Sequence, residues 1–280
     1  MKICVVQMQS FKGDIEQNIA KHLQFINTAV SHHADLIIFP ELSITNYEPS
    51  LAQDLATTSE DGRFDTFQTI SDEQNITIGI GVPLKTDAGL TISMILFRTN
   101  QARLTYAKKY IHADEKPFFI SGTNFPTFQL QGTNIAPAIC YEISIKKHAE
   151  AANQHGATIY VASVAKTAQG VTQAHKRLAQ IAKQQGIPVL MSNNVGPADN
   201  FVGAGKTAVW DKYGNLRAQL DDISEGLIIF DTSNDETTVI QQESVAIKKM
   251  VEHSYDTAVE TQKENETKIP YLWLLAQKMT

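Results

Sequence analysis

The sequence predicts a layered α/β fold. Short apolar runs with strand character alternate along the chain with longer segments whose apolar residues recur at helical spacing. The chain has 280 residues, of which 42% are hydrophobic and 19% charged, so it is long enough for one large domain or two small ones. It contains no internal repeat, low-complexity tract or linker rich in Pro, Gly or Ser.

The N-terminal part of the chain shows this alternation first. Ile3–Val6 is a predicted strand, and apolar residues then recur every three or four positions from 15 to 30, which predicts a helix capped by Asp14. The next apolar run, Leu36–Phe39, ends at Pro40 and is typical of a strand buried on both faces.

The same pattern continues to residue 230. The later predicted helices are Arg63–Asn75, Lys146–His155 and Val171–Gln185. The later predicted strands are Ile76–Val82, Thr91–Arg98, Leu104–Lys108, Asn134–Cys140, Thr158–Ala162, Val189–Ser192, Thr207–Trp210, Leu216–Leu220 and Leu227–Phe230. We expect Leu227–Phe230 to close the series.

Beyond Asp231 the composition becomes polar. We place a domain boundary near residue 240 and expect residues 241–280 to pack on the core or on a partner subunit. The apolar patch Tyr271–Leu275 must be buried somewhere, either in its own core or in a dimer contact.

Charge and composition exclude several classes of function. The net charge of −6 argues against a nucleic-acid-binding face, and no apolar run approaches the ~20 residues that a membrane helix needs. Two cysteines, Cys4 and Cys140, are too few for a disulfide framework and form no zinc-binding pair. With no signal peptide, we expect a cytoplasmic protein that binds neither membrane nor nucleic acid.

Two polar residues directly follow apolar strands, where sites gather in open α/β sheets. Glu41 comes after Leu36–Phe39 and Pro40, so it is either a partly desolvated general base or a surface acid. Cys140 follows another apolar run and is either a nucleophile or a buried structural thiol. Cys4 lies within a strand and is interpreted as a core residue.

Two more polar residues lie between them in the chain. Lys108 could stabilise an oxyanion, although its neighbour Lys109 could equally be the lysine that points inward. Glu115, seven residues after Lys108, could pair with it and hold its charge, or could be an exposed loop acid.

The order of these residues resembles the nitrilase superfamily, the carbon–nitrogen hydrolases. The chain reads FPEL at 39–42, YAKKYIHADEKPFFISG at 106–122 and AICYE at 138–142. The family's Glu, Lys and Cys triad then corresponds to Glu41, Lys108 and Cys140, and its second Glu to Glu115. The family's lysine commonly follows a Tyr by two residues, which selects Lys108 over Lys109.

The resemblance extends to about residue 231. Arg177, Asn193 or Asn194, Gly196 and the 211–215 turn fit the family's later pattern. The chain departs from it after Cys140, where residues 143–146 (Ile-Ser-Ile-Lys) contain no arginine, and at Tyr110, where a His is common. The missing arginine affects the expected class of substrate more than it affects the assignment of the triad.

The resemblance implies a four-layer α-β-β-α sandwich and a cysteine-dependent hydrolase of a small amide or N-carbamoyl substrate. It implies no metal or organic cofactor, and a homodimer or larger homo-oligomer. The expected substrate-binding residues are Tyr47, Phe118, Tyr141, Asn193 and Phe201. An acyltransferase and a non-catalytic binding protein of the same fold are the alternatives.

Overall fold

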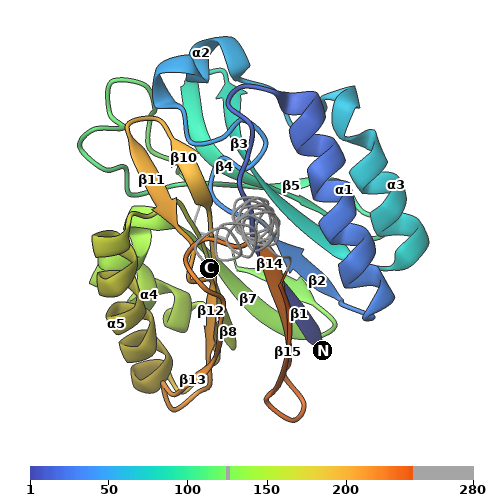
Figure 1. Cartoon of the computed structure of the whole chain (residues 1–280), viewed down its shortest axis with the longest axis vertical. Helices are drawn as coiled ribbons and strands as arrows, with labels where there is room; N and C mark the ends of the chain where they lie inside the picture. Colours follow the sequence, from blue (N-terminus) through green and yellow to red (C-terminus); the bar gives the residue numbers. More distant parts are fainter. Residues whose placement is uncertain (124–126, 242–280) are drawn as a thin grey trace, which may run out of the picture. The chain divides into compact units, whose positions relative to one another are not determined.

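The computed structural model describes residues 1–123 and 127–241, which form two large β-sheets flanked by helices (Figure 1). The first sheet has seven strands in the order β15-β14-β1-β2-β3-β4-β5, and the second has six in the order β13-β12-β9-β8-β7-β6. The central pairs β1–β2 and β2–β3, and β7–β8 and β8–β9, are parallel. Parallel neighbours bring the carboxyl ends of these strands to one edge of each sheet.

The strands of the first sheet are β1 (Lys2–Gln7), β2 (Leu36–Ile38), β3 (Thr77–Thr86), β4 (Gly89–Phe97), β5 (Leu104–Ala107), β14 (Gly226–Asp231) and β15 (Glu236–Gln241). Those of the second sheet are β6 (Phe128–Leu130), β7 (Thr133–Ile139), β8 (Ile159–Val164), β9 (Val189–Asn193), β12 (Ala208–Trp210) and β13 (Leu216–Gln219). A separate hairpin consists of β10 (Val195–Ala198) and β11 (Phe201–Ala204).

Five helices accompany the sheets. They are α1 (Ile15–Ser31), α2 (Ala52–Leu55), α3 (Asp65–Gln74), α4 (Lys146–Gln154) and α5 (Ala168–Gln185) in the described part of the chain. Short 3₁₀ turns lie at Pro49–Leu51, Gly62–Phe64 and Cys140–Ser144.

Alternating side chains of each strand join different apolar cores. In β1, Ile3 and Val5 belong to the core between the two sheets, whereas Cys4 and Val6 belong to the core beneath α1 and α3. A third core joins the second sheet to α4 and α5, which lie on the opposite side in Figure 1. The order of layers is therefore α-β-β-α, as the family resemblance implies.

Three parts of the secondary structure differ from the expectation. Helix α5 begins at Ala168 rather than Val171, because the Thr167 hydroxyl caps it by accepting a hydrogen bond from the Gly170 N–H. The strand β6 and the hairpin β10–β11 were not predicted. The series also does not close at Phe230, since β15 pairs with β14 at the sheet edge.

The strand β15 escaped prediction because most of its side chains are exposed, so its sequence lacks apolar alternation. The patch Tyr271–Leu275 and the rest of the predicted extension beyond residue 241 lie outside the described residues. No helix in the described ranges is long and apolar enough to cross a membrane.

Candidate active site

Glu41 lies in a tight loop that follows β2 and rests against β3. Its side chain is buried, and the next residue, Leu42, has a left-handed backbone with φ of 53°. Gly81 in β3 makes this approach possible, since a Cβ there would lie 2.4 Å from the Leu42 nitrogen and 2.5 Å from the Pro40 oxygen. A glycine is therefore required to bring the backbone of Glu41 this close to the sheet.

Lys108 extends from the end of β5 into the same buried region. Its N–H continues the ladder by donating to Ile92 O in β4 at 2.8 Å. Its ammonium has no exposed surface and donates to Glu41 Oε1 at 2.8 Å and to Glu115 Oε1 at 2.6 Å. Lys109 remains half-buried outside this cluster, so the inward-pointing lysine is Lys108.

The two carboxylates that hold Lys108 differ in what else they bind. Glu115 uses both oxygens, because Oε1 also accepts from the Tyr47 hydroxyl at 2.9 Å and Oε2 accepts from the His112 N–H at 2.8 Å. The buried Oε2 of Glu41 has no hydrogen-bond partner in the described part of the chain. Glu41 is thus the carboxylate with an oxygen available for proton transfer.

Cys140 begins the 3₁₀ turn directly after β7. Its backbone is left-handed, with φ of 45°, a conformation that a residue other than glycine adopts at some cost in strain and that is common at functional sites. The Sγ atom lies 3.8 Å from Ala165 O, and the thiol is near enough to Glu41 to lower the pKa of that carboxyl. The structure therefore brings Glu41, Lys108, Glu115 and Cys140 together.

Burial and charge set the protonation of this cluster. Burial raises the pKa of Glu41, an effect that Lys108 partly offsets and Glu115 reinforces. Burial, followed by the negative charge of Glu41, raises the pKa of the Cys140 thiol to about 11. Burial alone would lower the pKa of Lys108, but its attraction to Glu41, Cys140 and Glu115 raises it above the ordinary value. At neutral pH the sulfur is therefore a thiol beside a carboxylate of raised pKa, and the lysine is charged.

Glu142 is a buried acid that the sequence analysis did not single out. Its Oε2 accepts from the Tyr106 hydroxyl at 2.6 Å and from the Ile139 N–H at 2.8 Å, and its Oε1 accepts from the Lys109 N–H at 2.7 Å. These bonds join the backbone beside Lys108 to the backbone beside Cys140. In the sequence, only its position two residues after Cys140 indicated that Glu142 could belong to the site.

A cavity of about 680 Å³ opens over Cys140. Four of the five expected substrate-binding residues line it, namely Tyr47, Phe118, Tyr141 and Phe201. The others in its wall are Pro49, His112, Asp114, Glu115, Ser144, Ala165, Lys166, Thr167, Gly170, Gln173, Asp199 and Asn200.

Asn193, the fifth expected residue, does not line this cavity. Its side chain is fully buried, where Oδ1 accepts from the Lys166 N–H at 2.9 Å and Nδ2 donates to Gly205 O at 2.6 Å. The expectation fails because these two backbone groups occupy the amide, so Asn193 instead supports the cavity wall at Lys166.

Arg177, which the sequence placed on a helix, lies on α5. Its Nε donates to Ile143 O at 3.2 Å and so ties α5 to the turn that begins with Cys140. Among the residues that the structure describes, no group of three His, Cys, Asp or Glu side chains is placed to hold a metal ion.

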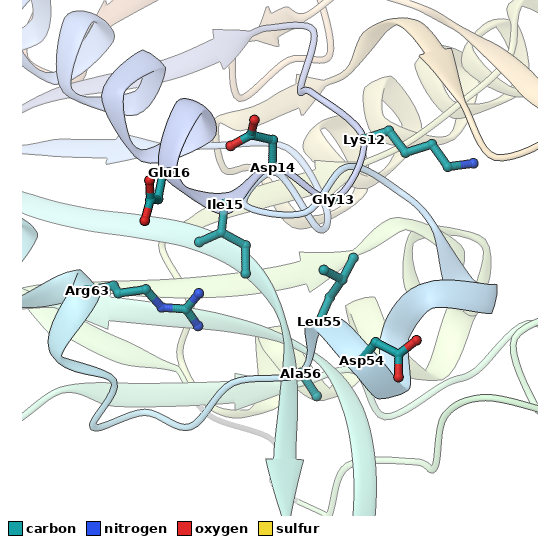
Figure 2. A pocket seen from close by; sticks show the side chains of 9 residues that line it. All are labelled: Lys12, Gly13, Asp14, Ile15, Glu16, Asp54, Leu55, Ala56 and Arg63. Carbon is teal, nitrogen blue, oxygen red and sulfur yellow. The ribbon is translucent and has the colours of Figure 1, made fainter.

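A second pocket, of about 450 Å³, lies between the start of α1 and the end of α2 (Figure 2). Figure 2 shows Glu16 and Arg63 on one side of it and Asp54 on the other. Several of its charged side chains already have partners, since Lys12 is paired with Glu48, Asp14 caps α1 and Arg63 is paired with Asp61. We therefore assign the candidate site to the cavity over Cys140.

Known proteins resemble this chain over most of its length. A family model described as carbon–nitrogen hydrolase matches residues 2–241. A glutamine-dependent NAD(+) synthetase from Acinetobacter baylyi is 25% identical over 235 residues, which are 81% of this chain but only 43% of the synthetase. A protein named as a probable nitrilase from Schizosaccharomyces pombe is 22% identical over 250 residues, 86% of this chain and 91% of its own.

Solved structures share the fold. A Cys-to-Ala variant of the amidase from Nesterenkonia sp. AN1, in complex with butyramide, superposes with a TM-score of 0.76 at 21% identity, covering 84% of this chain and 92% of its own. Another variant of that amidase carries the acetamide moiety of fluoroacetamide on its active-site cysteine, with a TM-score of 0.74 at 21% identity, covering 82% of this chain and 89% of its own.

The close approach at Gly81 gives a first prediction. The substitution Gly81→Ala is expected to lower the free energy of unfolding by about 1–3 kcal/mol, because the new methyl group would displace the backbone that carries Glu41. Chemical denaturation measures the loss. Gly62→Ala is the matched control, since its Cβ would meet nothing closer than 3.7 Å. Equal stability of the two variants would contradict the account.

The raised pKa of Cys140 gives a second prediction. Between about pH 6 and 8 the ultraviolet absorbance of a thiolate should be absent, because burial and Glu41 hold the proton on sulfur up to a pKa of about 11. The measurement is the difference in absorbance between the protein and its Cys140→Ala variant as pH rises. A thiolate signal at neutral pH would show that the resting state is an ion pair instead.

Proposed function

The chain belongs to the carbon–nitrogen hydrolase family and is a C–N hydrolase, and from this premise we propose that it cleaves a small amide or N-carbamoyl substrate with Cys140 as nucleophile. The observation that carries the proposal is the unoccupied Oε2 of Glu41 beside the Cys140 thiol, with Lys108 fixed next to both.

Glu41 acts as the general base in the first step. A thiol with a pKa near 11 is almost entirely protonated at neutral pH, so attack on the substrate requires a proton acceptor in contact with the sulfur. Glu41 has the open oxygen, and burial raises its pKa toward the range in which a carboxylate both takes and returns a proton. Glu115 has no free oxygen and positions Lys108.

Lys108 stabilises the oxyanion that forms when sulfur attacks the carbonyl carbon. An ammonium group has three N–H donors, and two are used by Glu41 and Glu115, which leaves one for the substrate oxygen. The Tyr141 N–H, which follows the nucleophile, is the second donor. These donors are fixed before the reaction, so little reorganisation is needed as charge develops.

The remaining steps follow from the same groups. Glu41 protonates the leaving nitrogen, the C–N bond breaks, and ammonia or an amine departs while a thioester forms on Cys140. Glu41 then accepts a proton from water, whose oxygen attacks the thioester carbon. The carboxylic acid leaves and the proton returns to sulfur, which restores the starting state.

The assembly and location of the protein remain predictions. We propose that residues 1–240 form the hydrolase domain, that residues 241–280 pack on the core or on a partner subunit, and that the protein is a cytoplasmic homodimer or larger homo-oligomer. Sedimentation of the full chain tests the oligomeric state.

Substitutions in the cluster test the proposed roles. Ammonia release is measured for simple amides, ω-amides and N-carbamoyl amino acids. Cys140→Ala should abolish turnover, Glu41→Gln should lower kcat by roughly 100- to 10,000-fold through loss of the base, and Lys108→Met should lower it by roughly 100- to 1,000-fold through loss of an oxyanion donor. Lys109→Met is the matched control for Lys108.

Two outcomes would contradict these roles. Full activity of Cys140→Ala would rule out the thioester route. A loss in Lys109→Met equal to that in Lys108→Met would show that the oxyanion donor has been misassigned.

A further inference from the structure

Lys166 is a cation in the cavity wall without a counter-ion. It is half-buried, and in the described ranges its ammonium has no hydrogen bond or ion pair. Three other charged groups of the wall have partners, because His112 pairs with Asp114 and Glu115 binds Lys108. Asp199 is exposed on the β10–β11 turn and forms no ion pair with Lys166.

The backbone of Lys166 is held on both sides. Its N–H donates to the buried Asn193 Oδ1 at 2.9 Å, and its carbonyl accepts from the Ala204 N–H at 2.9 Å. The preceding carbonyl, Ala165 O, is the group that contacts the Cys140 sulfur. Lys166 therefore directly follows the residue whose carbonyl contacts the nucleophile, and its backbone is fixed, a placement that suits a binding group.

The positive charge of Lys166 acts on the reacting sulfur. Burial and Glu41 raise the pKa of Cys140, and among the groups that lower this pKa Lys166 has the largest effect, followed by Lys108. An uncompensated ammonium this close to a small-molecule cavity favours ligands that bring a negative charge.

We propose that Lys166 binds a carboxylate of the substrate, so that the enzyme prefers amides that carry an acid group at the end opposite the amide. This inference rests on the proposed function and narrows it. A singly charged carboxylate fits because Lys166 is the one lysine or arginine in the lining of this cavity as described, and the polar lining residues that follow it on the same stretch of chain, Thr167 and Gln173, are neutral. The turn after Cys140 contains no arginine that could bind the substrate's carboxylate instead.

A competing role for Lys166 is stabilisation of the Cys140 thiolate or the oxyanion. That role would affect every substrate alike, whereas a carboxylate subsite affects only the anionic ones. The two roles are separated by the ratio of kcat/KM for succinamate to kcat/KM for butyramide, two amides with the same carbon count, of which only the first carries a carboxylate.

The wild-type enzyme is expected to prefer succinamate, and Lys166→Met should reduce the succinamate-to-butyramide ratio by at least about 10-fold. Lys176→Met, which removes the same charge from the exposed side of α5, should leave the ratio unchanged. Lys166→Arg should retain most of the preference, which shows that a loss in Lys166→Met is not misfolding. An unchanged ratio, or an equal loss on both amides, would overturn the inference.

Binding to the Cys140→Ala variant, measured by calorimetry, separates failure of this inference from failure of the proposed function. Succinamate should bind at least about 10-fold more tightly than butyramide, and the added substitution Lys166→Met should remove the difference. If wild-type enzyme hydrolyses neither amide, the proposed function fails for this class, while the binding result still decides the role of Lys166. Equal binding of both amides would overturn the inference whatever the activity.

Discussion

The ion cluster around Lys108 is the constraint on which the rest of the site depends. Its ammonium has no exposed surface, and an uncompensated charge there would cost several kcal/mol. The loop after β2 must therefore deliver Glu41, and the loop after β5 must return to deliver Glu115. Gly81 permits the first approach, and Gly122, whose N–H donates to Lys108 O, permits the second, since a Cβ at residue 122 would lie 2.3 Å from Ala107 O.

The unequal bonding of the two carboxylates separates their roles. Glu115 is saturated by Lys108, Tyr47 and His112, whereas Glu41 keeps an oxygen beside the Cys140 sulfur. Two acids share one lysine, so the cluster retains negative charge, and this charge together with burial keeps the proton on the thiol. The protonation of Cys140 is therefore set by the same carboxylates that hold Lys108. Lys166 adds a positive charge from the side of the cavity.

The features predicted from the sequence are those with a local cause. Glu41 and Cys140 follow apolar strands, so the pattern of apolar residues alone predicts their position at strand ends. Only the family resemblance predicted that they share a site with Lys108. The edge strand β15 has no apolar alternation, because solvent and not a second layer faces its side chains. Asn193 and Glu142 act through backbone groups distant in sequence, such as Gly205 and Lys109, and Lys166 matters because it shares a cavity with Cys140. Such contacts have no local signal.

The most direct test is a crystal structure of the Cys140→Ala variant with a bound amide. The account predicts the amide oxygen within hydrogen-bond distance of Lys108 Nζ and the Tyr141 N–H, with its carbonyl carbon facing residue 140 and its nitrogen facing Glu41. An amide bound elsewhere, or Lys108 and Glu41 turned away from residue 140, would contradict it.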